Sequence, residues 1–366
     1  MAGGPLVVVA AGGTGGHLFP AEALSLALAR RGATVDLATD ERAARYSAEF
    51  PARTVHLIPS ATLRGGSPLA LARTAWTLGR GIARAFALFG RLRPAAVVGF
   101  GGYPTVPPVI AARLRGIPTL IHEQNGVMGR ANRVLAPFAD AIATSFPHVL
   151  DRYPRLAAKA THTGNPVRPA VIEAAEVAYA PHGEVFRIVV FGGSQGARIL
   201  ADVVPRAVEL VAVAVRARLA IVQQAREEDV ARVAEIYRRL GVAAEVAPFF
   251  RDLPARLAAS HLVVSRSGAS TVAELAAIGR PAILVPLPHA LDQDQRANAA
   301  VLERAGGAIC LEQDRFTPKR LAAEIAAFAA EPARLVAMAQ AARRCGAPAA
   351  AERLADLVLR RASTGG

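Results

Sequence analysis

The 366-residue sequence has few of the residues that build disulfide-rich, metal-binding or membrane-spanning proteins. Its two cysteines, Cys310 and Cys345, are too few for a disulfide framework or a metal-ligand cluster, and they fit a reducing cytoplasm. The first five residues lack the basic segment of a signal peptide. Glycines and prolines interrupt the charge-free stretch 94–112, so we expect a folded, soluble chain without a transmembrane helix.

Acidic residues are scarce in the first half of the chain. Residues 1–165 hold 18 Lys and Arg against 8 Asp and Glu, whereas residues 166–366 hold 25 against 21. Such a basic half favours an anionic partner, although arginines that merely solvate helices would give the same balance. A nucleic-acid-binding protein would need aromatic stacking platforms or a known module. Five tyrosines and one tryptophan supply neither, so we expect no nucleic-acid partner.

Short apolar runs alternate with helical patterns along the whole chain. After a turn-rich break at residues 163–169, a candidate hinge, the same alternation restarts. We therefore predict an α/β fold of two doubly wound, Rossmann-like domains, 1–165 and 166–346, that face an interdomain cleft, with ligands at the carboxyl ends of the strands. The expected strands are residues 6–10, 34–38, 54–58, 96–99, 119–122, 141–144, 188–191, 219–223, 244–246, 262–265 and 282–285.

Two glycine-rich turns follow apolar strands, at residues 12–17 and 192–198. Glycine lets the backbone approach a ligand closely, and the N–H groups at a helix start point toward it. Neither turn has the glycine spacing of a dinucleotide fingerprint, and neither continues as a P-loop, which disfavours a dehydrogenase. A tight strand–helix turn without a ligand is the alternative interpretation of each.

Six motifs in sequence order resemble one known family. They are GGTGGH at 12–17, GGY at 101–103, HEQN at 122–125, TGNPVR at 163–168, GGSQGAR at 192–198 and RSGASTVAE at 266–274. In these the chain resembles the bacterial N-acetylglucosaminyltransferases that convert lipid I to lipid II in peptidoglycan synthesis. The resemblance implies a GT-B fold and inverting transfer from UDP-N-acetylglucosamine to the 4-hydroxyl of the muramoyl sugar of lipid I, with no cofactor and no metal.

The same resemblance implies peripheral attachment to the cytoplasmic side of the inner membrane. The first domain would bind the acceptor and the membrane, and the last helix, within residues 347–366, would return to it. The second domain would bind the UDP-sugar. Another GT-B enzyme, either a UDP-N-acetylglucosamine 2-epimerase or a glycolipid synthase, is the alternative, and an epimerase would need no lipid and no basic membrane face.

The resemblance also implies the donor-binding residues. Ser194 would meet the diphosphate, Phe250 the uracil through its backbone, and Glu274 the ribose hydroxyls. Structural alternatives are a helix N-cap at Ser194 and a capping box between Thr271 and Glu274. A core phenylalanine pair would explain Phe249. The full donor set is Thr14, Gly15, Gly16, Asn125, Arg168, Ser194, Phe250, Ala269, Ser270, Thr271, Val272, Ala273, Glu274 and Gln295.

Two positions depart from the family pattern. Asp294 stands where the family often has Gln or His, and Gln223-Gln224 stands where it usually has His-Gln. Gln295 matches a glutamine that contacts the sugar hydroxyls. The pair Asp292 and Asp294 has the spacing of a metal–diphosphate bridge, but that arrangement belongs to a different glycosyltransferase fold.

His17 is the best candidate for the general base, because an imidazole can take a proton from the acceptor hydroxyl near neutral pH. Its alternative role is to donate to the acceptor diphosphate. Asn125 is the second catalytic candidate and would orient donor or acceptor, while His122 and Glu123 would hold its loop together. The resemblance implies an acceptor site of Gly13, Thr14, His17, Gly102 and Tyr103.

Residues 69–92 read as one helix with a basic stripe. Arg73, Arg80, Arg84 and Arg91 fall within about 40° of one another at helical spacing, and Trp76 lies beside them. This pattern suits anionic lipid headgroups, although a solvated helix face would also show it. We expect the opposite face to pack on the first domain. Its residues are Leu71, Leu78, Ile82, Phe86 and Phe89.

Overall fold

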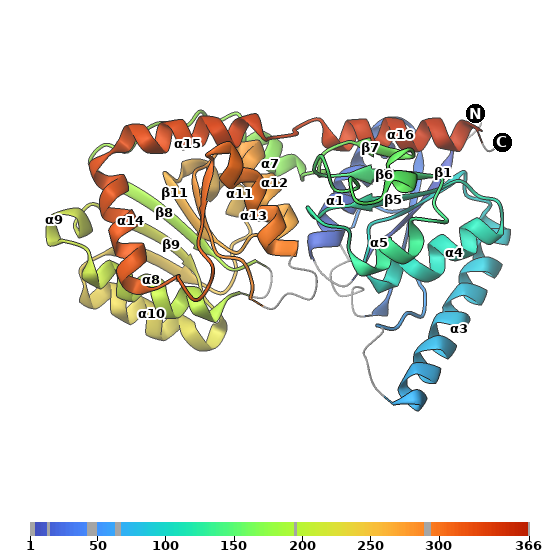
Figure 1. Cartoon of the computed structure of the whole chain (residues 1–366), viewed down its shortest axis with the longest axis horizontal. Helices are drawn as coiled ribbons and strands as arrows, with labels where there is room; N and C mark the ends of the chain where they lie inside the picture. Colours follow the sequence, from blue (N-terminus) through green and yellow to red (C-terminus); the bar gives the residue numbers. More distant parts are fainter. Residues whose placement is uncertain are drawn as a thin grey trace. The chain divides into compact units, whose positions relative to one another are not determined.

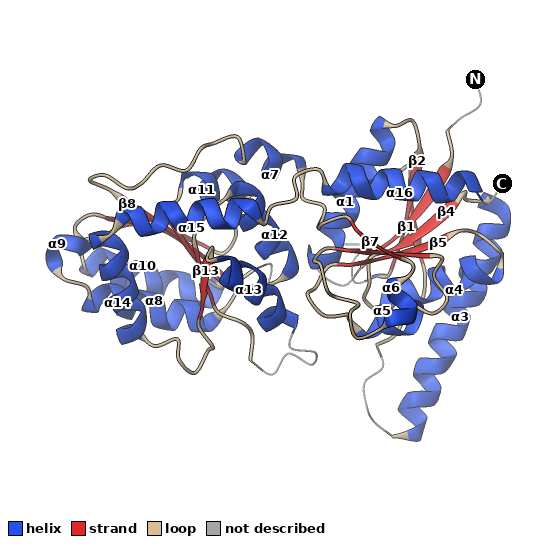
Figure 2. Cartoon of the chain, turned by 45° about the horizontal axis from the view of Figure 1, so that its top comes forward, coloured by secondary structure: helices blue, strands red, loops and turns tan. Residues whose placement is uncertain are grey.

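The computed structural model describes residues 4–12, 15–41, 50–62, 67–193, 196–288 and 294–364. It divides the chain into two compact units: unit 1 is Met1–Arg168 with Pro348–Gly366, and unit 2 is Pro169–Ala347. In each unit a parallel sheet lies between helices, as Figures 1 and 2 show. The α/β class and the doubly wound architecture predicted from the sequence are confirmed.

The sheet of unit 1 has the order β3-β2-β1-β4-β5-β6-β7, and all its strand pairs are parallel. Its central strands are buried on both faces, which is why they read as continuous Val, Ile and Ala runs. The strand order reverses between β1 and β4, and in doubly wound sheets ligands bind at such a point, beyond the carboxyl ends of the strands. The strands are β1 (Leu6–Ala10), β2 (Thr34–Thr39), β3 (Thr54–Leu57), β4 (Ala96–Gly99), β5 (Thr119–Glu123), β6 (Ala141–Thr144) and β7 (Ala160–His162).

The helices of unit 1 follow these strands, and one of them comes from the far end of the sequence. They are α1 (Gly15–Arg30), α3 (Pro68–Leu92), the 3-10 helix η1 (Tyr103–Thr105), α4 (Val106–Leu114), α5 (Arg130–Leu135), α6 (Pro154–Ala157) and α16 (Ala350–Thr364).

Unit 2 repeats the same winding with the strand order β10-β9-β8-β11-β12-β13. The reversal lies between β8 and β11, so the ends of these two strands mark the corresponding ligand position. Its strands are β8 (Phe186–Phe191), β9 (Leu219–Gln224), β10 (Ala243–Ala247), β11 (Leu262–Ser265), β12 (Ala282–Leu284) and β13 (Ala308–Cys310). Its helices are α7 (Pro169–Ala174), α8 (Arg198–Leu210), α9 (Val213–Arg216), α10 (Glu227–Arg239), α11 (Leu253–Ala259), α12 (Ala269–Ile278), α13 (Asp294–Ala305), α14 (Pro318–Ala330) and α15 (Pro332–Arg344).

All eleven expected strands are present, within two residues at each end. The sequence did not indicate β7 and β13, two of the four edge strands, each of three residues. Three residues are too few for a clear strand pattern, and β7 is also largely exposed.

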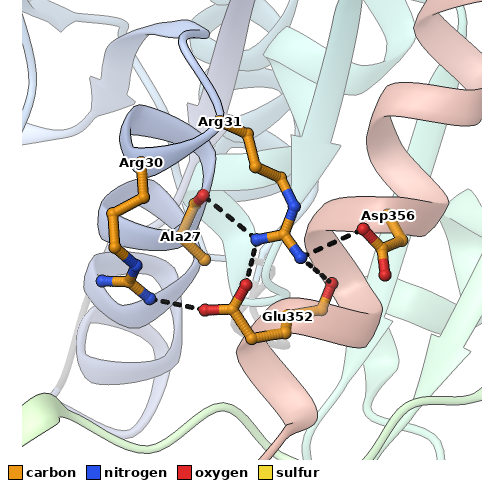
Figure 3. A network of polar contacts seen from close by, with 5 residues as sticks. All are labelled: Ala27, Arg30, Arg31, Glu352 and Asp356. Atoms are coloured by element: carbon orange, nitrogen blue, oxygen red, sulfur yellow. Dashed lines mark hydrogen bonds and ion pairs between the residues drawn. The ribbon is translucent and has the colours of Figure 1, made fainter.

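Helix α16 packs against α1 in unit 1, although the two are more than 300 residues apart in sequence. Its apolar side chains, among them Leu354 and Val358, join the core of that unit. At the rim, Figure 3 shows Arg30, the last residue of α1, and Arg31 reaching Glu352 of α16, with Arg31 also 3.0 Å from Asp356. The end of the chain thus completes the fold of its beginning.

Helix α3 extends away from the rest of unit 1, as Figure 1 shows. Its buried residues are Gly81, Ala85 and Phe89, so its first three turns bury no side chain. A Cβ at Gly81 would lie 2.1 Å from the carbonyl oxygen of Pro59, so glycine is what allows the helix to cross its unit closely there. None of the helices in the described part of the chain is long and apolar enough to span a membrane.

The expectation that one apolar face of α3 packs on unit 1 is partly wrong. Phe89 is buried, but Leu71 and Phe86 are 46% and 38% exposed. Leu71 is exposed because the part of α3 before residue 80 buries no side chain. Phe86 is partly covered by Arg115, whose guanidinium carbon lies 3.9 Å from the Phe86 ring centroid.

Candidate active site

In unit 1 the first glycine turn meets the segment that follows β4. Gly101 and Gly102 have φ of +78° and +71°, a region that favours glycine. A Cβ at Gly102 would lie 3.2 Å from Cδ2 and 3.3 Å from Nε2 of His17, so the imidazole rests directly on this glycine. Tyr103 comes next and begins η1. The structure therefore brings His17, Gly102 and Tyr103 together at the β1/β4 reversal.

A buried carboxylate organises the loop after β5. Glu123 is 1% exposed, and its Oε1 accepts from the backbone N–H of Asn125 at 3.0 Å and from the Nδ2 amide of Asn125 at 3.2 Å. Its Oε2 accepts from the N–H of Gly129 at 2.9 Å and from Nδ2 of Asn132 at 2.8 Å. Burial raises the pKa of Glu123, while these four donors act in the opposite direction by stabilising the ionised form.

His122 is a structural residue of the same loop. Its Nδ1 lies 3.0 Å from the amide Nε2 of Gln124, and its Nε2 lies 3.1 Å from the carbonyl of Gly164. These partners assign the Nε2–H tautomer, which donates to Gly164. Burial lowers the pKa of His122 to about 4, the bond to Gly164 raises it, and nearby His17 lowers it. A neutral His122 therefore ties β5 to the segment before Arg168.

In unit 2 the second glycine turn also requires glycine, at Gly192. A Cβ at Gly192 would lie 2.3 Å from the backbone nitrogen of Ala197, a distance no side chain tolerates. The N–H of Gly192 donates to Oε1 of Gln224, whose Nε2 donates to the carbonyl of Pro248. Gln224 therefore joins the ends of β8, β9 and β10. The N-cap of α8 is Ala197, which corrects the alternative of an N-cap at Ser194.

The alternative interpretation of Thr271 and Glu274 as a capping box is wrong. Helix α12 begins at Ala269 with Gly268 as its N-cap, so Thr271 is the third helical residue. Glu274 lies a further three residues along the helix and is buried. Capping therefore does not explain the buried carboxylate at this position.

Gln295 lies beside the start of α12. The hydroxyl of Ser267 donates to the carbonyl of Gln295 at 2.8 Å, and Nδ2 of Asn298 donates to the carbonyl of Ser267. The side-chain Oε1 of Gln295 accepts from the N–H of Leu287 at 3.0 Å, which fixes the orientation of its amide. The structure thus places Gln295, a predicted donor residue, next to Ser267, two residues before α12 begins at Ala269.

The two phenylalanines after β10 differ in environment. Phe250 is buried, and the guanidinium of Arg256 lies 4.4 Å from its ring centroid. Phe249 is 62% exposed, so the expectation of a core pair is wrong for Phe249. Only the second side chain turns inward at the end of the strand.

Several predicted positions lie outside the described residues: Gly13, Thr14, Ser194, Gln195 and Asp292. Among the described residues, no group of three or more His, Cys, Asp or Glu could hold a metal ion. Gln124, Gln224, Asn132 and Asn298 also hold these loops by hydrogen bonds, and the sequence did not single them out for that role. Gln124 lies in the HEQN motif and Gln224 ends β9, which are signals that could have found them, whereas Asn132 and Asn298 lie inside α5 and α13.

Two doubly wound units, each with a glycine turn and polar side chains at its strand-order reversal, define the GT-B class of glycosyltransferase folds. The fold is similar to the crystal structure of Acinetobacter baumannii MurG, with a TM-score of 0.79 and 30% sequence identity over 97% of this chain and 99% of that one. A UDP-N-acetylglucosamine 2-epimerase structure agrees with a TM-score of 0.67 at 16% identity, covering 99% and 97%, which reflects the shared fold alone.

Residues 7–144 match the Glycosyltransferase family 28 N-terminal domain, and residues 187–354 match the family's C-terminal domain. The chain belongs to glycosyltransferase family 28. A relative from Rhodopseudomonas palustris (strain BisB18) is 64% identical over 97% of this chain and 96% of its own length. That relative is named UDP-N-acetylglucosamine–N-acetylmuramyl-(pentapeptide) pyrophosphoryl-undecaprenol N-acetylglucosamine transferase.

Proposed function

We propose that this protein transfers N-acetylglucosamine from UDP-N-acetylglucosamine to the 4-hydroxyl of the muramoyl sugar of lipid I, with inversion, giving lipid II and UDP for peptidoglycan synthesis. The observation that carries the proposal is the similarity to the named transferase over nearly the whole of both chains. It is supported by the position of the two glycine-rich segments after β1 and β8, next to the strand-order reversals where ligands bind in doubly wound sheets.

In unit 1 we assign the acceptor to the surface around His17. Gly102 contacts its imidazole and Tyr103 follows Gly102, while Gly13 and Thr14 are assigned to this site from the sequence motif alone. His17 then takes the proton of the attacking hydroxyl or donates to that diphosphate. Asn125 orients a sugar, because the Glu123 carboxylate fixes its amide.

In unit 2 we assign the donor to the carboxyl ends of β8, β10 and β11. Ser194 and the turn around it receive the diphosphate, whose negative charge grows as the sugar leaves. The backbone at Phe250 reads the uracil, Glu274 accepts from the ribose hydroxyls, and Gln295 contacts the sugar. The remaining donor contacts that we propose in unit 2 are Ala269, Ser270, Thr271, Val272 and Ala273.

For localisation we propose peripheral attachment to the cytoplasmic side of the inner membrane through α3. Arg73, Arg80, Arg84 and Arg91 are all exposed, and Trp76 beside them is 71% exposed. Basic side chains attract anionic headgroups, and an exposed tryptophan suits the interface between headgroups and acyl chains. The first turns of α3 project from unit 1 (Figure 1), and they bury no side chain, so the part of the stripe before residue 80 is accessible to a membrane.

A transfer assay tests the reaction. Purified protein is mixed with a lipid I analogue and UDP-N-acetylglucosamine, UDP-glucose or UDP-galactose. We expect lipid II formation with the first donor at a much higher kcat/KM than with the other two. Epimerisation of UDP-N-acetylglucosamine without acceptor, or equal use of all three donors, would contradict the proposal.

A further inference from the structure

Two side chains far apart in sequence meet at the start of α1. The guanidinium carbon of Arg168 lies 4.1 Å from the ring centroid of Phe19. Both belong to unit 1: Phe19 lies in the second turn of α1, and Arg168 is the last residue of the TGNPVR motif. A guanidinium over an aromatic face at this distance is a cation–π contact, and the flat stack restricts the arginine's rotamers.

The Phe19 ring also contacts Gly15 of the first glycine turn. A Cβ at Gly15 would lie 3.1 Å from Cε2 and 3.2 Å from Cζ of Phe19, so the ring folds back onto the first residue of the helix. Phe19 therefore bridges Gly15 and Arg168. The arginine is held beside a helix N-terminus whose first turn carries no acidic residue.

The backbone leading to Arg168 is also fixed. His122 binds the carbonyl of Gly164, and Nε of Arg353 in α16 donates to the carbonyl of Thr163 at 2.9 Å. Residues 163–167 are all buried. With its backbone anchored and its side chain stacked, Arg168 is pre-organised, which lowers the conformational entropy lost when an anion binds.

We infer that Phe19 is a positioning residue: its ring holds the Arg168 guanidinium beside the first turn of α1, where it receives a diphosphate group. The helix N-terminus and the guanidinium favour the same ligand charge, and a guanidinium pairs with phosphate oxygens through parallel N–H donors. Both proposed substrates contain a diphosphate, the UDP of the donor and the lipid-linked diphosphate of the acceptor. The inference rests on the proposed function, since that function supplies both ligands.

The test compares four variants, Phe19→Leu, Phe19→Tyr, Arg168→Ala and the Phe19→Leu/Arg168→Ala double variant. Leucine keeps apolar volume but has no aromatic face, and tyrosine keeps the face. Calorimetry measures Kd for UDP and for uridine, which lacks phosphate, and steady-state kinetics measures KM for a lipid I analogue. Phe86→Leu is the matched control, because Phe86 also stacks under an arginine of unit 1.

We expect Phe19→Leu to weaken one diphosphate ligand by about three- to tenfold, the range of a partly exposed cation–π contact. Phe19→Tyr and Phe86→Leu should leave it unchanged. A raised Kd for UDP but not for uridine assigns the donor diphosphate, and a raised acceptor KM with unchanged UDP affinity assigns the acceptor diphosphate. In the Arg168→Ala background, Phe19→Leu should add nothing, because Phe19 acts through that arginine.

Unchanged affinity for both diphosphate ligands in a folded Phe19→Leu protein would overturn the inference. So would additive effects of the two substitutions, or equal losses for UDP and uridine, which indicate a general structural role. These results leave the proposed function standing if the wild-type protein still forms lipid II. A wild-type protein that neither binds UDP nor transfers the sugar overturns the function first, and the inference with it.

Discussion

Glu123 holds Asn125 twice, through the backbone N–H at 3.0 Å and the side-chain amide at 3.2 Å, with a single carboxylate oxygen. The other oxygen holds Gly129 and Asn132. All four partners are donors, so the arrangement needs a side chain that accepts at both ends. Only an ionised carboxylate of this length meets that need.

Replacing Glu123 by glutamine therefore disrupts one half of the arrangement. The new NH₂ group faces two N–H donors, and leaving buried donors unpaired costs about 1–3 kcal/mol. Because Asn125 is displaced, we expect kcat to fall at least about tenfold. Glu352→Gln, a carboxylate-to-amide change on the surface of the same unit, is the control and should keep kcat. Equal kcat values for the two variants would contradict the role of Glu123.

The contact between α1 and α16 allows packing and ion pairing to be weighed against each other. Glu352 is exposed enough that its pairs with Arg30 and Arg31 should contribute less than about 1 kcal/mol. Leu354 is fully buried, so Leu354→Ala should cost about 2–5 kcal/mol. Thermal unfolding measures the loss of stability in each variant, and hydrogen exchange measures how firmly α16 remains bound to its unit. A larger loss from Glu352→Gln than from Leu354→Ala would show that ion pairs hold the helix.

Stability should depend on pH through His122. Its pKa in the folded protein is about 4, below the ordinary 6.5 of the unfolded chain, so unfolding takes up a proton between these values. The stabilisation is complete above about pH 6.5 and is lost as the pH falls toward 4, by about 2 kcal/mol between about pH 7.5 and pH 5. His122→Gln should flatten this part of the urea-unfolding profile. An identical pH slope in the variant would contradict a neutral buried His122.

Glu274 gives a prediction about donor affinity. A carboxylate that accepts from ribose hydroxyls contributes about 1.5–3 kcal/mol, so Glu274→Gln should raise Kd for UDP-N-acetylglucosamine by about ten- to hundredfold. Since Gly268 is the N-cap of α12, little change in Tm is expected. Glu324→Gln, at another buried helical carboxylate of unit 2, serves as the control. Unchanged donor affinity in Glu274→Gln would remove this residue from the donor site.

Membrane binding should be electrostatic. Charge reversal at Arg80 and Arg84 should weaken binding to anionic vesicles by at least about 1 kcal/mol per arginine, and high salt should weaken binding of the wild type. Arg206→Glu with Arg239→Glu, exposed arginines of unit 2, changes the net charge equally and is the matched control. Binding that is insensitive to salt, or equal loss in both double variants, would contradict the role of α3.

The sequence predicted what local patterns encode. Buried runs such as Val7–Val9 indicated the central strands, and the two glycine turns indicated the candidate ligand-binding end of each sheet. It failed where tertiary packing decides. Thr271 and Glu274 have capping-box spacing, yet α12 begins three residues earlier than that spacing requires. Leu71 has the periodicity of a packed residue, but the first residue that α3 buries is Gly81.

The contact of Phe19 with Arg168 could not be predicted from the sequence either, because 149 residues separate the two and no pattern links them. Likewise, the four donors on Glu123 become visible only when the loop closes around it. Sequence patterns indicate which elements form, whereas such contacts depend on how the formed elements meet.

The chemistry of the product tests the central claim most directly. The protein is incubated with UDP-N-acetylglucosamine and a lipid I analogue, and the disaccharide product is examined by NMR. We predict one new linkage from N-acetylglucosamine to the 4-hydroxyl of the muramoyl sugar, in the β configuration, with one UDP released per linkage. An α linkage, attachment at another hydroxyl, or UDP release without sugar transfer would contradict the account.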